Sequence, residues 1–441
     1  PDTAYLSKVY ASNGTRTTWT WSGWVKRSTL GSIYYIFHAN DTGNLVSTEL
    51  FFNSDNTLKF REYNGSSYIS EQYTTQVFRD ISSWGHLVFV WNTTQATSSN
   101  RVKIYWNGLQ ITAFSTSTFP SQNATSIFNS GAGYTNRLGV ASTATFDGYM
   151  AEVNFIDGQA LTPSSFGETD AVTGVWKPKK YAGTYGTNGF YLNFSDNSSN
   201  TAATIGKDYS GNGNNWTPNN ISVTSGTTYD SMLDVPTLYA DGGNGRGNYA
   251  VLNPLSKSSS SGTTPTAGNL DIGATTTACD YMSTMFMPSG KWYFEVKVNQ
   301  IDTSTPTSNP SIGVQGQGFP TSPKVSVDGA GSLTVDGSTS SLSGFTYTTG
   351  DTISFAFDVD NKKAWVGKNG TWYNSGDPAA GTNATGTWSA SGEVAPFIRT
   401  RGNASASFNA GQRPFTYTPP TGFKALNTTN LPDPTVKKGS S

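Results

Sequence analysis

The sequence predicts an all-β protein made of two β-sandwiches joined by a turn-rich connector, and three observations lead to this class. Short runs rich in Val, Tyr, Phe, Trp and Thr recur about every ten to twenty residues, with Gly, Asn and Ser turns between them and no helical periodicity. Only 13% of the 441 residues are charged while 13% are aromatic, which favours a folded chain over a disordered one. Aromatic residues lead into an Asn-Gly step twice, at Asn107-Gly108 and at Asn369-Gly370.

The first region reads as a series of strands. In TTWTWSGWVKR, Trp19, Trp21 and Gly23 share one face of an alternating strand. The run LVFVW (87–91) is apolar at every position, so we expect both of its faces to be buried. Asn107-Gly108 closes a tight turn, because both residue types accept positive φ. Strands are expected in SIYYIFHA, STELFFN, TLKFREYN, HLVFVWN, VKIYWNG and FDGYMAEVNFIDG.

From about Val175 to Gly245, turn-dense segments such as YSGNGNNWTPNN replace the strand pattern. We expect a connector there, with a few short strands packed on a neighbour. The stretch SKSSSSGTTPT (256–266) is expected to be a long loop, and the end of the chain, TNLPDPTVKKGSS, to be mobile. Between these two segments the strand pattern returns in KWYFEVKV, PSIGVQG, TISFAFDVD, KAWVGKNG, VAPFIRT and ASASFNAG.

These patterns resemble two known families. WSGWVKR, WGHLVFVW, VKIYWNG and FDGYMAEVNFIDGQALTPSSFGE together resemble laminin-G-like, concanavalin A-like jelly rolls over residues 1–172. GKWYFEVKV, PSIGVQG, GDTISFAFDVDNKKAWVGKNG, VAPFIRT and ASFNAGQRPF resemble a SPRY domain over residues 246–428. The resemblance implies tandem concanavalin A-like sandwiches, with residues 173–245 as the connector and residues 429–441 as a flexible tail.

Two further segments resemble tailed-bacteriophage virion proteins, especially those of marine and cyanobacterial phages. They are KDYSGNGNNWTPNNISVTSGTTYDSMLDVPT and FNAGQRPFTYTPPTGFKALNTTNLPDP. The resemblance implies a tail fibre, spike or capsid-surface protein on the virion surface that attaches to a host glycan or receptor. Other virion proteins and further copies of the chain are the partners that it implies. Two alternatives stay open: a decoration protein that binds only other virion subunits, and a polysaccharide depolymerase.

Carboxylate pairs were considered for catalysis, because glycoside hydrolysis needs two carboxylates about 5 to 9.5 Å apart. In AEVNFID, Glu152 is expected to share its face with Asn154, and Asp157 to lie past the end of the strand. In FDVD, Asp358 and Asp360 share a face, which we interpret as a solvated face that enters a turn. We therefore expect no catalytic residue and a protein that is not an enzyme.

Metal, cofactor, nucleic-acid and membrane functions find little support. With two histidines (His38 and His86) and one cysteine (Cys279), no zinc site, Cys–His nucleophile or intrachain disulfide is expected. His86 precedes a buried strand and is expected to pack or to hydrogen-bond. Loop carbonyls could hold a structural Ca²⁺, but no spacing indicates one, and we expect neither metal nor cofactor. The net charge of −1 argues against nucleic-acid binding, and no apolar run suits a membrane span.

Aromatic residues near turns are the remaining indication of a binding site, because sugar rings stack on Trp and Tyr. Trp372 and Tyr373 follow the second Asn-Gly step and are expected to point to opposite faces. Arg399 and Arg401 share a face of FIRTRG. We predict these four residues as ligand-binding, at the loop ends of a sandwich. The alternative interpretation makes the aromatic residues core or interface and the arginines a solvated edge.

Overall fold

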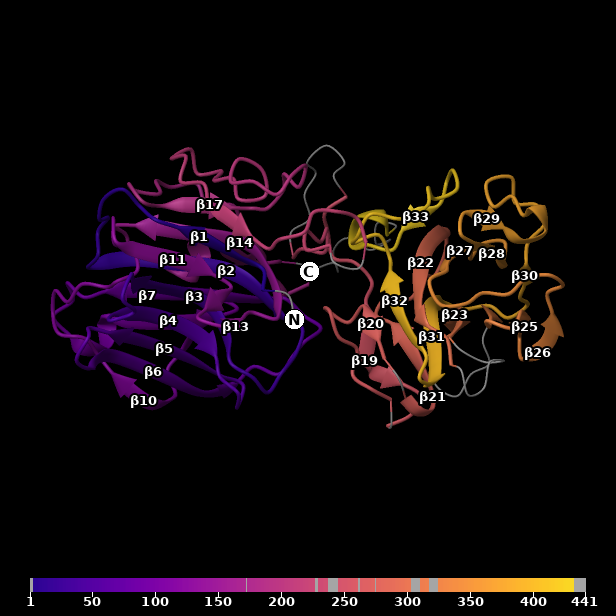
Figure 1. Ribbon diagram of the computed structural model, residues 1–441, viewed down its shortest axis with the longest axis horizontal. Helices are drawn as coiled ribbons and strands as arrows, with labels where there is room; N and C mark the ends of the chain where they lie inside the picture. The colour runs from indigo at the N-terminus through magenta and orange to yellow at the C-terminus, as the bar shows by residue number, and fades with distance from the viewer. Residues whose placement is uncertain are drawn as a thin grey trace. The chain divides into compact units, whose positions relative to one another are not determined.

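The computed structural model describes residues 3–171, 173–226, 229–236, 245–260, 262–273, 275–302, 310–316 and 324–431. It divides into two compact units (Figure 1). Among the described residues, unit 1 comprises residues 3–224 and Tyr229–Ser231, and unit 2 comprises residues 225–226 and 232–431. No helix in the described ranges is long and apolar enough to cross a membrane. The helices there are the 3-10 turns η1 Ser98–Asn100, η2 Pro163–Ser165, η3 Tyr373–Ser375 and η4 Thr428–Asn430.

Unit 1 is a sandwich of an eight-stranded and a six-stranded antiparallel sheet. In spatial order the first contains β10 Phe114–Thr118, β6 Tyr68–Val77, β5 Thr57–Tyr63, β4 Ser47–Phe52, β3 Tyr34–Asp41, β11 Tyr134–Leu138, β1 Tyr5–Lys8 and β18 Thr217–Asn219. The second contains β17 Phe190–Leu192, β14 Gly148–Asp157, β2 Thr18–Arg27, β7 Gly85–Asn92, β8 Val102–Trp106 and β9 Leu109–Ile111. Two small pairs complete it, β12 Val140–Ala141 with β13 Ala144–Thr145, and β15 Gly167–Thr169 with β16 Trp176–Pro178.

The core of unit 1 is a packed set of aromatic rings between these two sheets. Trp19 is fully buried and lies 5.3 Å from Phe89 and 5.5 Å from Phe128, measured between ring centroids. Phe60 on the opposite sheet lies 4.2 Å from Phe89. Rings at these separations add favourable edge and stacking contacts to the burial of apolar area. The alternation predicted for Trp19 and Trp21 is confirmed, because both face this core.

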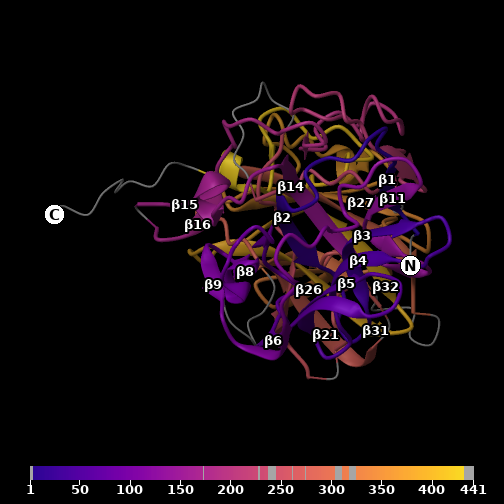
Figure 2. The same cartoon turned by 90° about the vertical axis from the view of Figure 1, so that its left-hand side faces the viewer.

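The outer face of the six-stranded sheet is covered by later parts of the chain. Val88 and Val90 of β7 pack there in a cluster with Phe166, whereas Phe89 of the same strand faces the main core. The expectation that both faces of LVFVW are buried is therefore confirmed. Figure 2 shows β8, β9, β15 and β16 on one side of unit 1 and β3, β4 and β5 on the other.

His86 hydrogen-bonds to Trp176, which belongs to one of the segments that cover the six-stranded sheet. Trp176 Nε1–H donates to His86 Nδ1 at 3.0 Å, so the proton of the neutral ring is on Nε2, which lies 2.8 Å from Ser22 Oγ. The imidazole also stacks on Trp24 at 4.9 Å. The predicted packing and hydrogen-bonding role of His86 is confirmed. Burial lowers the pKa of His86 to about 3.

Both Asn-Gly steps form the predicted hairpin turns. Asn107 and Gly108 have φ of 47° and 84°, and they join β8 to β9. Asn369 and Gly370 have φ of 49° and 82°, and they join β28 Lys363–Lys368 to β29 Thr371–Trp372. Positive φ at both central residues is the condition for a two-residue hairpin turn whose twist matches that of its strands.

Unit 2 is a second sandwich of two largely antiparallel sheets. The seven-stranded sheet has the order β19 Leu252–Lys257, β21 Thr275–Ser283, β31 Val394–Gly402, β23 Ser311–Gly316, β24 Val325–Val327, β25 Ser332–Val335 and β26 Ser338–Ser341. The other sheet has the order β20 Asp271–Ile272, β32 Ser405–Asn409, β22 Lys291–Gln300, β27 Thr352–Asp358, β28 and β29, with β30 Gly386–Thr387 on β28 and β33 Lys424–Ala425 on β22. The predicted all-β class is thus confirmed.

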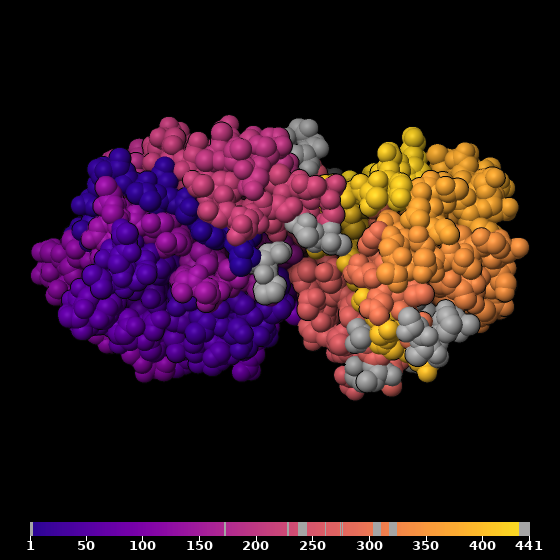
Figure 3. Space-filling model, viewed as in Figure 1, coloured from indigo at the N-terminus to yellow at the C-terminus, as the bar shows by residue number. Residues whose placement is uncertain are grey.

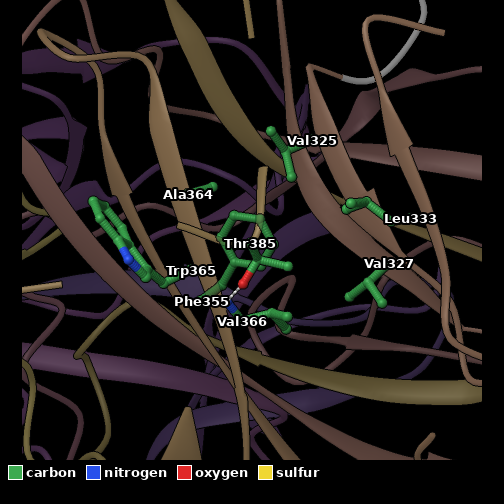
Figure 4. Close-up of a pocket in the computed structure, with 8 residues that line it drawn as sticks. All are labelled: Val325, Val327, Leu333, Phe355, Ala364, Trp365, Val366 and Thr385. Carbon is green, nitrogen blue, oxygen red and sulfur yellow. Dashed lines mark hydrogen bonds between the residues drawn. The ribbon is translucent and has the colours of Figure 1, made fainter. Parts of the chain in front are cut away.

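The core of unit 2 is an apolar cluster that includes several aromatic rings. Phe294 lies 5.2 Å from Phe355 and 5.7 Å from Phe408, between ring centroids. A space too small to hold a water molecule lies among Val325, Val327, Leu333, Phe355, Ala364, Trp365, Val366 and Thr385 (Figure 4). The Thr385 hydroxyl in this lining accepts the Val366 N–H at 3.0 Å. Because the lining is almost wholly apolar and belongs to the core, we assign this space to imperfect packing and not to ligand binding.

Several boundaries differ from the expectations. Asp157 is the last residue of β14 and does not lie past its end. The stretch expected as a loop from Ser256 begins inside β19, whose last residue is Lys257. Within the segment predicted as connector, β17 pairs with β14 and β18 with β1 of unit 1. The predicted tail begins inside η4, and its residues 432–441 lie outside the described ranges.

One buried carboxyl holds the eight-stranded sheet to a neighbouring loop. Glu62 of β5 is 1% exposed and accepts hydrogen bonds from Thr48 Oγ1 at 2.7 Å, Ser126 Oγ at 3.1 Å and Ile127 N at 2.7 Å. Burial raises the pKa of Glu62 to about 8, against these hydrogen bonds and the charge of Arg16, which lower it. The side chain is therefore protonated over most of the acidic and neutral range.

We expect Glu62→Gln to alter how stability depends on pH. The folded-state pKa lies above the ordinary value, so the wild-type contribution is complete below about pH 4.5 and is lost as the pH rises through 8. Relative to Glu62→Gln, the wild type should lose up to about 1.4 kcal/mol of unfolding free energy per pH unit in this window. Urea unfolding of both proteins at pH 5 and pH 8 measures the difference. Equal changes in the two proteins would contradict the assignment.

Candidate functional site

The outer face of the eight-stranded sheet in unit 1 carries a cluster of aromatic and charged side chains. Along β4 and β5, inward residues such as Leu50 and Phe60 alternate with outward residues such as Glu49 and Arg61. Residues of β3–β6, indigo to purple in Figure 3, lie at the surface of unit 1. We call the outward side chains of β3–β6 and β11 the aromatic–charged face.

Strand pairing arranges this face in three rows that cross the strands. The first row contains Tyr73, Lys59, Phe51 and Tyr35. The second contains Glu71, Arg61, Glu49, His38 and Arg137. The third contains Tyr68, Tyr63, Ser47 and Asn40. Partners in a row are about 4.5 to 5.5 Å apart between neighbouring strands, so the face is a closely spaced grid.

Arg61 is the centre of the grid. Its Nε and Nη2 donate to the same carboxylate oxygen of Glu49, at 2.9 and 2.5 Å. Its guanidinium carbon lies 4.8 Å from the ring centroid of Phe51 and 5.2 Å from that of Tyr68. Burial alone would lower the pKa of Arg61, but the charge of Glu49 and the hydrogen bonds to it raise the pKa overall. The cation therefore lies within cation–π distance of two aromatic rings.

Tyrosine rings surround this centre. Tyr68 is 41% exposed and lies 5.1 Å from Tyr63, between ring centroids. The ammonium group of Lys59 lies 4.6 Å from the ring centroid of Tyr73. The Tyr73 hydroxyl donates to Glu71, and burial, this hydrogen bond and the charge of Glu71 raise the pKa of Tyr73 to about 12. The Tyr73 hydroxyl therefore stays protonated at any physiological pH.

His38 and Arg137 form the far end of the second row. Burial and the charge of Arg137 lower the pKa of His38 to about 4. Arg137 donates to Asn40 Oδ1. The second row therefore contains two carboxylates, two guanidinium groups and one imidazole that is neutral at pH 7.

The face has the parts that a sugar-binding surface requires. Aromatic rings offer apolar planes to the C–H faces of a pyranose, and ionised groups beside them form strong hydrogen bonds to hydroxyls. Arg61 has five N–H donors, of which Glu49 accepts two, and the Tyr35 and Tyr73 side chains also hydrogen-bond to its guanidinium. Ion pairing and ring contacts already fix the guanidinium, so binding immobilises little more of it.

The two carboxylates of this face are separated by a cation. Glu49 and Glu71 lie on β4 and β6 with β5 between them, and the Arg61 cation stands between the two carboxylates. The carboxyl with a raised pKa, Glu62, points inward and binds the Ser126 loop. Within the described ranges no group of three or more His, Cys, Asp or Glu side chains could hold a metal ion.

Trp372 and Tyr373 lie at the edge of a sheet in unit 2, and each is half-buried. Trp372 packs beside Tyr293, at 6.4 Å between ring centroids, on the outer side of its sheet. Tyr373 packs on Phe345 at 5.6 Å, against the main core. The expectation that the two rings point to opposite faces is therefore confirmed.

The two arginines lie on the other sheet of unit 2. Arg399 of β31 donates from Nε and Nη2 to the two carboxylate oxygens of Asp280, at 2.5 and 2.9 Å, and these bonds raise its pKa. Arg401 is exposed near the end of the same strand. The structure therefore places the four predicted residues as two pairs on two different sheets.

The acidic residues weighed for catalysis have structural contacts. Glu152 lies in a β-bulge with φ of 52° and accepts from the Tyr191 hydroxyl, so the regular alternation with Asn154 does not hold. Asp358 is 2% exposed and binds Asn361, so its interpretation as solvated was wrong. The strand ends at Asp358, and Asp360 consequently lies in the following turn.

Sequence reasoning missed the aromatic–charged face, although a signal for it was present. Once TLKFREY is read as a strand with Leu58 and Phe60 inward, its other positions, Lys59, Arg61 and Tyr63, must point outward. The neighbouring strand β6 was not predicted at all, because YISEQYTTQV is mostly polar. Pairing of distant strands brings these residues together, and a linear sequence does not reveal it.

Comparison with known proteins identifies the class of the first sandwich. A family model described as the concanavalin A-like lectin/glucanases superfamily matches residues 3–165, which include every residue of the aromatic–charged face. Unit 1 therefore contains a concanavalin A-like domain, as predicted. That description covers both lectins and glucanases and does not decide between binding and catalysis. A search of curated proteins finds no similar sequence.

Three solved structures show remote likeness. The SPRY domain of human HERC1 is 13% identical with a TM-score of 0.28, over 36% of this chain and 96% of that chain. A heptameric SAP-like pentraxin from Limulus polyphemus is 20% identical with a TM-score of 0.28, over 37% and 73%. A Bacteroides ovatus protein that its name assigns to carbohydrate binding is 15% identical with a TM-score of 0.34, over 49% and 56%. At these scores the likenesses carry no functional argument.

The two histidines give a direct test of the site's electrostatics. We expect the imidazoles of His38 and His86 to titrate near pH 4 and 3 in the folded protein, and Arg137→Gln to raise the pKa of His38 alone. Proton–nitrogen NMR of the imidazoles measures both, and His86→Gln assigns the signals because the chain has only two histidines. A midpoint near the ordinary 6.5 for either ring would contradict the structure.

Proposed function

We propose that this protein is a non-enzymatic carbohydrate-binding protein whose binding surface is the aromatic–charged face of unit 1. The observation that carries the proposal is the Arg61–Glu49 ion pair held between the rings of Phe51 and Tyr68. The matching family contains lectins, and its matched residues include this face.

Binding would use the grid in two ways. The exposed ring of Tyr68 stacks on the apolar face of a sugar, while the Arg61–Glu49 pair beside it offers charged groups to the sugar hydroxyls. Ser47 Oγ donates to Glu49 Oε1 at 3.1 Å, so the carboxylate is oriented from both sides before a ligand arrives. Successive strands repeat at about 4.8 Å, a step comparable with one pyranose residue, so a glycan chain lying across the strands would meet one strand per sugar.

The enzymatic alternative has weaker support. A hydrolase needs one carboxyl that stays protonated near its substrate, and Glu62, the carboxyl with a pKa of about 8, is sealed in the core. Glu49 is ion-paired, and Glu71 accepts from Tyr73. The face is consequently suited to holding a sugar and not to cleaving it.

We place this binding at the surface of a virion, in attachment to a host. This part of the proposal rests on the resemblance of the connector and C-terminal segments to tailed-phage virion proteins. Other virion proteins, further copies of this chain and a host-surface glycan are the partners it names. Immunogold labelling of purified particles, with the number of copies per particle, would separate a few fibres from an abundant decoration protein.

Removing the central cation or the exposed ring should weaken glycan binding. We expect Arg61→Ala and Tyr68→Ala each to raise Kd about tenfold, a change of about 1.4 kcal/mol, whereas Tyr68→Phe keeps the ring and changes Kd little. The measurement is a glycan array of host-envelope polysaccharides followed by calorimetry on the hits. Lys103→Ala removes a cation from the outer face of the other sheet and serves as the control.

A second measurement addresses catalysis. Incubation with the polysaccharides that bind should release no reducing sugar, and Glu71→Gln, Glu49→Gln and Glu152→Gln should leave this result unchanged. Release by the wild type that disappears in one of these variants would identify an enzyme. Absence of binding to every host-derived polysaccharide would count against attachment through glycans.

A further inference from the structure

The outer face of the second sheet in unit 2 carries a separate aromatic cluster. Tyr293 of β22 is fully buried, and its ring lies 4.9 Å from Phe415 and 6.4 Å from Trp372, between centroids. Phe415 belongs to the loop that runs from β32 to β33, and the rings of Trp372, Phe415 and nearby Tyr417 are all half-buried. Two separate segments of the chain therefore place aromatic rings beside Tyr293.

A buried carboxylate holds this loop in place. Glu295 of β22 is 2% exposed and accepts the Thr416 N–H at 2.7 Å, the Tyr417 N–H at 2.8 Å and the Tyr293 hydroxyl at 2.8 Å. Two successive backbone amides on one carboxylate fix both the position and the direction of the loop. The main core lies on the other side of the sheet, and on this side Phe415 and Trp372 pack against a smaller buried cluster that contains Tyr293.

Glycines allow two of the rings to lie against the backbone. A Cβ at Gly370 would lie 2.8 Å from the Tyr417 ring, and a Cβ at Gly367 would lie 3.1 Å from the Trp372 ring. Both rings therefore lie directly against the backbone of the β28–β29 hairpin, whose turn is Asn369-Gly370. The loop sequence PFTYTPP (414–420) has no charged residue, and Thr416 and Thr418 in it are exposed.

We infer that Trp372, Phe415 and Tyr417 form a second carbohydrate site, for an uncharged pyranose ring. Flat, half-exposed rings suit the apolar face of a sugar, and the exposed threonine hydroxyls can bond to its hydroxyls. The absence of charge in the loop sequence distinguishes this site from the aromatic–charged face and matches a neutral ligand. The inference shares its ligand class with the proposed function, but it concerns another unit and other residues. Glu295 is a positioning residue that acts through the loop.

The test uses the full chain with Arg61→Ala and Tyr68→Ala already introduced, so that unit 1 is disabled. Calorimetry with cellohexaose, maltohexaose, xylohexaose and chitohexaose should detect binding that does not change between 50 and 500 mM NaCl. Trp372→Ala and Tyr417→Ala should each weaken it about tenfold, while Trp372→Phe and Tyr417→Phe change it less than threefold. Glu295→Gln should weaken it as well, with both rings still present.

Three outcomes would overturn the inference. They are no binding of any of the four hexasaccharides, binding that Trp372→Ala and Tyr417→Ala leave unchanged, and binding of a Pro-x-x-Pro peptide with no saccharide. If Trp372→Ala does not fold, tryptophan fluorescence decides: saccharide should change the emission of the wild type but not that of Trp372→Phe. Binding at the aromatic–charged face is measured separately, by introducing Arg61→Ala into a Trp372→Ala protein and comparing the two.

Discussion

The structure depends on the packing of aromatic side chains between paired sheets. In unit 1, Trp19 of one sheet and Phe37 of the other lie 6.1 Å apart in a fully buried stack of rings. A strand that places such residues inward must place every second residue outward, so each sheet has a second face that the core does not use. What the protein can bind is decided by what covers these second faces.

In unit 1 the outer faces of the two sheets differ in what covers them. The six-stranded sheet is covered by later chain segments, in which Phe166 packs over Val88 and Trp176 binds His86. The eight-stranded sheet has instead filled its outward positions with rings and ion pairs that contact one another, so that Phe51 is only 2% exposed beneath Arg61. Such a face is rigid and needs no cover, and a rigid polar–aromatic plane loses little entropy when it holds a flat ligand. In unit 2, a loop anchored on Glu295 adds rings to a face on which Tyr293 and Trp365 are already buried.

The sequence was sufficient for the fold class because the relevant signals are local. Alternation around Trp19 and Trp21, the apolar run LVFVW and the two Asn-Gly turns each depend on a few consecutive residues, and the structure bears them out. The candidate face was not accessible in this way, because Tyr73, Lys59, Phe51 and Tyr35 are neighbours only through strand pairing. Asp358 is a second residue whose environment the local sequence pattern does not reveal. A carboxylate that looks solvated in FDVD is buried, because the turn that follows returns Asn361 to it.

The inner and outer faces of the eight-stranded sheet also constrain each other through register. Arg61 and Glu62 are consecutive, and the first points to the aromatic–charged face while the second points to the Ser126 loop. A shift of one residue in β5 would exchange them, putting a guanidinium into the core and removing the carboxyl from its three donors. The same shift would turn Leu58 and Phe60 out of the core, so the apolar residues and the acid bound to Thr48, Ser126 and Ile127 specify one register. That register aligns Arg61 with Glu49, and the geometry of the outer face therefore follows from contacts on the inner one.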